Sequence, residues 1–194
     1  WRCEKEHGGG MILDWGVHLI DQILQICPEK IVRVYCTCSH ITNNEVDDGF
    51  KLELTFADGA TAHVEVGTYN FLPLPRFYMQ CKEGSAIISD WRHNAHVAKL
   101  TAWQEKDVTP VQNAAGITKT MAPRTSDTIQ EYPLPEVESD ILDYYRNMAN
   151  VVRGLEEPIV KHDQVRRVFR LMEAIVRSHE TGEDVRDFDV PPAK

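Results

Sequence analysis

The stretch that decides the fold runs from Lys51 to Val66 and reads KLELTFADGATAHVEV. Polar and apolar residues alternate strictly from Lys51 to Phe56, and the alternation resumes after Asp58-Gly59. Alternation with a period of two is typical of a half-buried strand, and Asp-Gly between two such runs is a strong hairpin signal. The sequence therefore predicts an antiparallel hairpin with one apolar and one polar face.

Outward from this hairpin, the sequence carries further strand and helix signals. Runs rich in β-branched, aromatic and other apolar residues predict four more strands: Ile31–His40, Phe77–Cys81, Ala86–Asp90 and Ala95–Trp103. The second and third of these are joined by a turn over residues 82–85. Amphipathic periodicity predicts three helices: Met11–Ile26, Ser139–Arg153 and Asp163–Thr181. Strands in the middle and helices at both ends indicate the α+β class, with one large, mixed but mainly antiparallel sheet and helices on one face.

Residues 104–138 lack this periodicity and contain four prolines. A structureless loop of that length is uncommon in a compact domain. Two interpretations remain open. The segment is either an arm that packs on a partner subunit or covers a pocket, or an irregular surface excursion with a short strand near Ile129–Leu134.

Composition limits the class of protein. The chain has 194 residues, which suits one large domain, and its net charge of −9 argues against generic nucleic-acid binding. No apolar run is long enough to span a bilayer, and no signal peptide is visible. The five cysteines are scattered, so we expect reduced thiols and a cytoplasmic protein. Because the chain begins at Trp1, we also expect a piece of a longer protein.

The richest motif covers residues 7–21 and reads HGGGMILDWGVHLID. Asp14 and His18 are four residues apart on the predicted helix, so they share one face, and Asp21 follows about one turn later. Three interpretations fit this spacing: a structural cap or salt link, general acid/base catalysis, or a divalent metal site. No His-Glu-x-x-His signature supports the metal, and the spacing alone does not choose among the three.

The glycine run lacks the surroundings that two known motifs require. An oxyanion hole at His7-Gly8-Gly9-Gly10 would require a Gly-x-Ser-x-Gly elbow, and a dinucleotide loop would require a preceding strand; both are missing. The glycines therefore predict a tight approach of backbone at the start of the helix. Arg76 and Trp91 are candidate ligand contacts near strand ends, with plain surface positions as the alternative.

The pattern Gly-Gly-Gly-x-x-x-Asp-x-Gly-x-His-x-x-Asp over residues 8–21 resembles the Gfo/Idh/MocA family of NAD(P)-dependent oxidoreductases. The resemblance extends over nearly the whole chain. It includes the turn at residues 82–85 and the ending RSHETGEDV at residues 177–185, with its Ser-x-x-Thr-Gly pattern.

This resemblance implies that residues 1–194 form a C-terminal substrate-binding and oligomerisation domain, similar to that of glyceraldehyde-3-phosphate dehydrogenase. It implies a homo-oligomer built through the open sheet face and a sugar, inositol or related polyol as substrate. His18 would be the acid/base group and Asp14 a substrate contact, and we place Asp21, Arg76 and Trp91 as further substrate contacts. NAD or NADP would be bound mainly by an N-terminal Rossmann domain that this chain lacks.

The sequence departs from the family in lacking the glycine-rich cofactor loop and the Glu-Lys-Pro segment. We therefore expect these 194 residues to be inactive alone. Two alternatives to a dehydrogenase stay open: a non-catalytic assembly module, and a hydrolase or lyase of the same fold that retains its cofactor.

Overall fold

The computed structural model describes residues 1–92, 94–102, 111–112, 118–119, 128–135 and 137–186. The chain divides into two units. Unit 1 consists of Trp1–Phe71 and Ile141–Lys194, and unit 2 consists of Leu72–Asp140. Each unit is described by itself below.

The predicted hairpin is confirmed in unit 1. Strands β2 (Gly49–Phe56) and β3 (Thr61–Gly67) pair antiparallel, and β1 (Ile31–Ser39) pairs with the other edge of β2. The apolar positions of β2 are buried, whereas the polar positions alternate with them on the opposite face. That polar face is crossed by ion pairs, among them Arg33 with Glu53 at 3.3 Å. The strict alternation in the sequence thus separates core from solvent.

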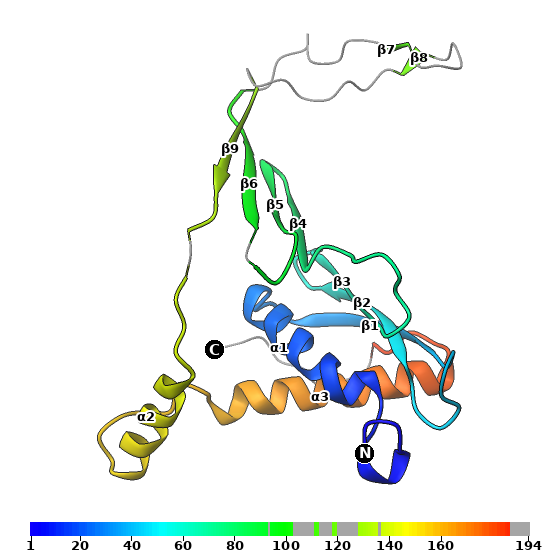
Figure 1. Ribbon diagram of the computed structural model, residues 1–194, viewed down its shortest axis with the longest axis vertical. Coiled ribbons are helices and arrows are strands. Elements are labelled where there is room, and N and C mark those ends of the chain that lie inside the picture. The colour runs from blue at the N-terminus through cyan, green and yellow to red at the C-terminus, as the bar shows by residue number, and fades with distance from the viewer. Residues whose placement is uncertain (93, 103–110, 113–117, 120–127, 136, 187–194) are drawn as a thin grey trace. The chain divides into compact units, whose positions relative to one another are not determined.

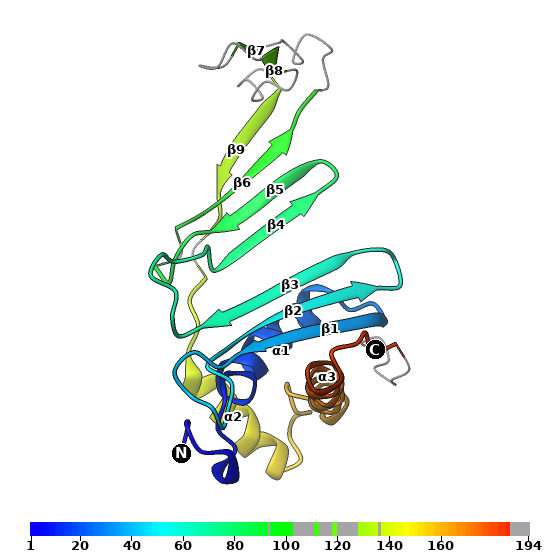
Figure 2. The same ribbon diagram turned by 90° about the vertical axis from the view of Figure 1, so that its right-hand side faces the viewer.

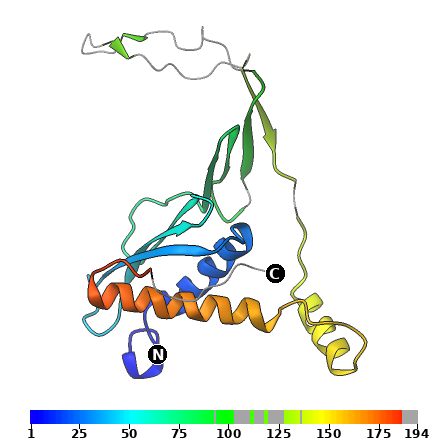
Figure 3. The ribbon, with the colours of Figure 1, turned by 180° about the vertical axis from the view of Figure 1, so that it is seen from behind.

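Two helices cover the apolar face of this sheet. Helix α3 (His162–Thr181) runs along β1, and α1 (Val17–Ile26) lies beside α3 (Figure 1; Figure 3). Apolar side chains from the helices and all three strands form one core, which includes Ile20, Leu54 and Leu171. This agrees with the α+β prediction and with helices on one face of a sheet.

A buried arginine joins the two helices. Arg167 of α3 is 4% exposed and donates hydrogen bonds to the carbonyl oxygens of Leu24, Cys27 and Glu29 at 3.1, 3.4 and 2.6 Å. These carbonyls lie at and beyond the C-terminus of α1, where helix carbonyls have no partner within the helix. Burial lowers the pKa of the Arg167 guanidinium.

The predicted helix Met11–Ile26 has the expected extent but not the expected geometry at its start. Residues Ile12–Gly16 form a π-helical turn, η2, and α1 continues from Val17. In a π-turn the hydrogen bonds join residues five apart, and such turns are rare and frequently occur at functional sites. Apolar periodicity indicates which face of a helix is buried but not which hydrogen-bonding pattern each turn has. It therefore does not distinguish this π-turn from an α-helical turn.

Unit 2 contains a four-stranded antiparallel sheet in the order β4-β5-β6-β9 (Figure 2). Its strands are β4 (Phe77–Cys81), β5 (Gly84–Ile88), β6 (Ala95–Leu100) and β9 (Ile129–Pro133). The predicted strands thus form two main antiparallel sheets of three and four strands, and the pairing between the described strands is antiparallel throughout.

Strand β5 begins at Gly84, two residues earlier than predicted. The turn between β4 and β5 is the pair Lys82-Glu83, because Gly84 already pairs with Cys81. A Cβ at Gly84 would lie 2.5 Å from the carbonyl oxygen of Ala98, so glycine allows β6 to approach closely.

The predicted strand near Ile129–Leu134 is confirmed as β9, and β7 (Val111–Gln112) pairs with β8 (Thr118–Lys119). Most of the proposed arm, together with Trp103, lies outside the described residues.

The remaining elements belong to unit 1. They are a 3₁₀ turn, η1 (Lys5–His7), and helix α2 (Ile141–Val152), which begins two residues after the predicted cap Ser139. All five cysteines are free thiols. Within the described part of the chain, no helix is both long and apolar enough to cross a membrane.

Candidate functional site

Asp14 and His18 lie at the junction between η2 and α1. Asp14 belongs to the π-turn and its side chain is 15% exposed, whereas His18 lies in the first turn of α1 and is exposed. Because the π-turn changes the helical register, the two residues are not aligned as they would be in an α-helix. No hydrogen bond between them is found among the described residues.

Asp14 has a cationic partner that the sequence analysis did not identify. Nε of Arg2 donates to Oδ2 of Asp14 at 2.6 Å. The Arg2 guanidinium also stacks over the Trp1 ring, 4.5 Å from its centroid, and its side chain is 58% exposed. This short, charge-assisted contact orients the carboxylate and leaves its other oxygen for a second donor. Arg2 lies twelve residues before Asp14, outside the predicted helix, so helical spacing could not reveal it.

His18 and Asp21 have local neighbours on the same helix. The His18 ring packs edge-to-face against Trp15, with a centroid separation of 6.5 Å. Among the described residues the His18 ring has no hydrogen-bonding partner, so its nitrogens remain available for a ligand. Asp21 instead accepts a hydrogen bond from Nε2 of Gln25 at 2.7 Å, as expected for an i, i+4 pair on an exposed helix surface.

The glycine between Asp14 and His18 has a packing role. A Cβ on Gly16 would lie 3.1 Å from the ring of Phe50, a fully buried residue of β2. Glycine therefore lets the helical backbone rest directly on the sheet. The core of unit 1 thus fixes how closely the helical segment that carries Asp14 and His18 packs against the sheet.

Arg76 and Trp91, the two predicted contacts in unit 2, lie together. The Arg76 guanidinium stacks over the Trp91 ring at 4.2 Å from its centroid and lies 5.7 Å from that of Phe77. Trp91 is 64% exposed, and Nε of Arg76 is buried without a hydrogen-bonding partner in the described part of the chain. The structure thus groups the predicted residues into two sets: Asp14, His18 and Asp21 in unit 1, and Arg76 with Trp91 in unit 2.

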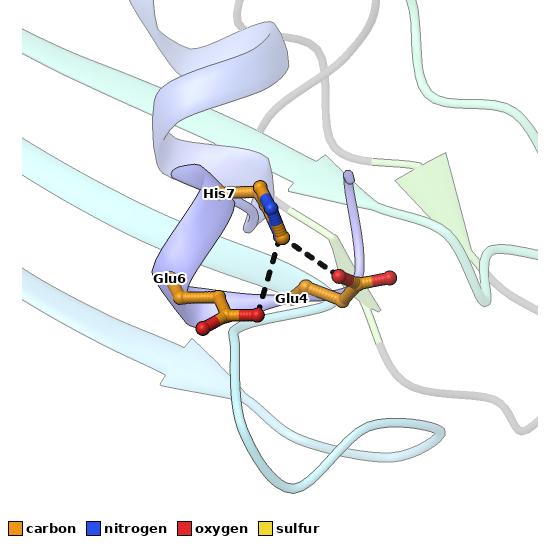
Figure 4. Close-up of side chains that lie close together, drawn as sticks. All are labelled: Glu4, Glu6 and His7. Carbon is orange, nitrogen blue, oxygen red and sulfur yellow. Dashed lines mark hydrogen bonds and ion pairs between the residues drawn. The ribbon is translucent and has the colours of Figure 1, made fainter.

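Two other features of unit 1 contain none of the predicted residues. Glu4, Glu6 and His7 bring three possible metal ligands together, with Nδ1 of His7 at 2.8 Å from Glu4 and 3.7 Å from Glu6 (Figure 4). All three are exposed, and exposed acidic groups commonly occur without an ion. A cavity of about 290 Å³ at the ends of β1–β3 is lined by both polar and apolar residues, among them Ser39, Lys51 and Phe50.

The sequence and the fold of this chain match those of known proteins. Residues 1–87 match the sequence model of the GFO/IDH/MocA C-terminal domain. The crystal structure of an NAD-binding protein from Listeria innocua is 41% identical, with a TM-score of 0.88. That match covers 96% of this chain and 54% of that protein, so this chain spans about half its length. No match was found among curated proteins.

Two more distant structures share the fold. One is the UDP-N-acetylglucosamine 3-dehydrogenase GnnA from Acidithiobacillus ferrooxidans, at 14% identity and a TM-score of 0.65, covering 88% of this chain and 49% of that one. The other is the WlbA dehydrogenase from Bordetella pertussis in complex with NADH and UDP-GlcNAcA, at 17% identity and a TM-score of 0.55, covering 92% and 45%. The fold and the family match define a domain of an oxidoreductase family. The chain is a C-terminal domain of the Gfo/Idh/MocA family.

Proposed function

We propose that this chain is the substrate-side domain of an NAD(P)-dependent oxidoreductase that acts on a sugar, inositol or related polyol. The observation that carries the proposal is the pair formed by Asp14 and His18. They lie in a rare π-helical junction, with the aspartate held by Arg2 and the imidazole free of hydrogen bonds among the described residues. Membership in an oxidoreductase family adds support.

In this proposal His18 exchanges a proton with the reacting hydroxyl or carbonyl oxygen of the substrate. An imidazole suits this role because its ordinary pKa lies close to neutral pH. Asp14 accepts a hydrogen bond from a substrate hydroxyl through the carboxylate oxygen that Arg2 does not occupy. Asp21, one turn further along α1, is exposed enough to accept another hydroxyl.

Arg76 and Trp91, a separate set in unit 2, are proposed as further substrate-binding residues. The Arg76 guanidinium stacks over the Trp91 ring, which holds it in place, and a guanidinium binds anionic or hydroxyl oxygens. Among the described residues Arg76 has no hydrogen bond or ion pair, so its terminal nitrogens are available.

NAD or NADP is proposed to be held mainly by the rest of the complete protein. This chain contains no Gly-x-Gly-x-x-Gly loop between a strand and a helix, so it does not supply the usual pyrophosphate cradle. When bound, the nicotinamide would accept or donate the hydride. The relative with bound NADH supports a nicotinamide cofactor without deciding between NAD and NADP.

Calorimetric titration of the complete protein with NAD(H) and NADP(H), followed by absorbance assays with a panel of polyols and nucleotide sugars, tests this function. We expect binding of one cofactor and a substrate-dependent change in nicotinamide absorbance. A protein that binds neither cofactor would instead be an assembly module. A protein that binds cofactor and converts substrate without a net absorbance change would be a hydrolase or lyase.

We also propose that the protein is a homo-oligomer assembled through one face of the sheet in unit 2. Cross-strand pairing places apolar side chains on that face: Phe77, Met79, Ala86, Ile88, Val97 and Tyr132. Met79 and Tyr132 are each 41% exposed, so in the isolated chain this apolar face is only partly covered.

Sedimentation of the complete protein tests the assembly. A lysine at position 79 would place a charge in an apolar interface, so Met79→Lys should lower the assembled mass. Gln80→Lys is the matched control, because residue 80 is the next position of β4 and points to the opposite face. Equal masses for wild type and Met79→Lys would contradict assembly through this face.

A further inference from the structure

The start of the helix that carries Asp14 is held by Asp47, a residue of the loop between β1 and β2. The backbone N–H of Met11 donates to the carbonyl oxygen of Asp47 at 3.2 Å. The N–H of Ile12 donates to Oδ2 of the same residue at 3.0 Å. N–H groups in the first turn of a helix lack partners within the helix. Asp47 satisfies two of them and places a carboxylate where the helix dipole favours negative charge.

Gly10 makes room for this contact. Its φ is +109°, and a Cβ at this position would collide with Oδ1 of Asp47. A larger residue would therefore face both backbone strain and a clash with the carboxylate. The last glycine of the Gly-Gly-Gly run thus has a specific partner, 37 positions further along the sequence.

The contact with Asp47 lies directly next to the proposed catalytic pair. The N–H of Asp14 donates to the carbonyl oxygen of Gly10 at 3.0 Å, which closes the turn that Asp47 holds at its start. Two residues after Asp14, the backbone at Gly16 rests on Phe50. The π-turn is therefore fixed on both sides of Asp14, once by a hydrogen-bonded carboxylate and once by a buried ring.

Opposing effects act on the pKa of the Asp47 carboxyl group. Burial raises the pKa of Asp47, while the backbone N–H groups of Ile12 and Met11 oppose that shift. The nearby imidazole of His40, which stacks on the His179 ring at 6.0 Å, opposes it as well.

We infer that Asp47 is a positioning residue for the Asp14–His18 site, because its carboxylate fixes the start of the π-turn that carries Asp14 and continues into the first turn of α1, which carries His18. This inference rests on the proposed function in taking that pair as the site. The hydrogen bonds at the helix start do not depend on that function. The positioning role of Asp47 and the oxidoreductase function can therefore be disproved separately.

Asp48 provides a matched control because it is adjacent, acidic and buried but supports a different segment. Its carboxylate accepts hydrogen bonds from Oγ of Ser39 at 2.9 Å and from Oγ1 of Thr42 at 3.0 Å. These contacts hold the loop after β1 and do not reach the helix. A general defect of the β1–β2 loop would therefore appear in Asp48→Ala as well.

The experiment measures two properties of the complete protein in the absence of substrate. The first is hydrogen exchange at the amides of Ile12 and Asp14. The second is the NMR signal of the His18 ring, which the neighbouring Trp15 ring shifts. Asp47→Ala should speed exchange at these amides about tenfold, as expected for a lost helix cap, and move the His18 signal. Asp47→Asn keeps an acceptor for the Ile12 N–H, so amide exchange and the His18 signal should stay close to those of wild type.

Asp47→Leu, which is close in size to aspartate but lacks an acceptor, should behave as Asp47→Ala does. It serves as the second variant if the alanine substitution unfolds the protein. Unchanged exchange in both variants would overturn the inference. So would faster exchange with an unmoved His18 signal, or equal effects from Asp48→Ala. None of these outcomes depends on turnover, so a failure of the oxidoreductase proposal would be recognised separately.

Discussion

Unit 1 and unit 2 are both built around an antiparallel sheet, but they differ in how that sheet is covered. In unit 1 the sheet β1–β3 buries one face under α1 and α3, and every fully buried apolar side chain of the described residues lies there. In unit 2 the described strands carry partly exposed apolar residues and no helix lies on them within the unit. The comparison teaches that unit 1 has its own core, while the described residues of unit 2 include no fully buried apolar side chain.

The largest difference is expected for a leucine-to-alanine substitution in each unit. Leu54 in β2 is 1% exposed, and Leu74 in unit 2 is 55% exposed. Leu54→Ala should lower the free energy of unfolding by about 2–5 kcal/mol, because it removes buried methyl groups and leaves a cavity. Leu74→Ala should change it by less than about 0.5 kcal/mol. Urea unfolding of the complete protein measures both changes in the free energy of unfolding. Equal losses would contradict the difference in burial between the two units.

A smaller difference is expected between two arginines, each with a buried Nε that has no partner. Arg167 donates to three backbone carbonyls at and beyond the C-terminus of α1, so Arg167→Met should cost about 1–3 kcal/mol of stability. Among the described residues Arg76 in unit 2 contacts only aromatic rings, so Arg76→Met should cost under about 1 kcal/mol. Thermal unfolding of both variants tests whether Arg167→Met loses more stability than Arg76→Met. A larger loss for Arg76→Met would mean that Arg76 has structural partners in the complete protein.

The smallest expected effect is a dependence of stability on pH that arises from Asp48 in unit 1. The backbone N–H of Thr42 holds the pKa of Asp48 below its ordinary value, with Ser39 and the Thr42 hydroxyl adding to the effect. A depressed pKa in the folded state stabilises the protein above the ordinary aspartate pKa of about 3.9, and this contribution is lost as the pH falls through the folded-state value. The stability difference between wild type and Asp48→Asn should therefore shrink on acidification. A difference that is constant with pH would contradict this assignment.

Much of the local structure could be predicted from the sequence because it depends on local signals. Strict alternation around Asp58-Gly59 predicted the hairpin correctly, and apolar periodicity predicted α3 to within one residue. The π-turn was missed because its fixed points, Asp47 and Phe50, lie more than 30 residues away from it. Arg167 was missed for the same reason, since its carbonyl partners are about 140 residues distant.

The candidate site was predictable only in part. Spacing brought Asp14 and His18 to attention, but the partner of Asp14 proved to be Arg2, which no helical pattern includes. The pairing of Arg76 with Trp91 depends on two segments of unit 2 meeting in space, so the sequence offered each residue only as a separate candidate.

The central claim is that His18 is the acid/base group of an oxidoreductase, and turnover of the complete protein by His18→Ala tests it most directly. His63→Ala is the matched control, because His63 is an exposed histidine on the polar face of β3 in the same unit. With a substrate that wild type oxidises, His18→Ala should lower kcat by about 10²–10⁴-fold. Its Kd for the nicotinamide cofactor and the kcat of His63→Ala should stay close to those of wild type. Wild-type turnover by His18→Ala would contradict the claim.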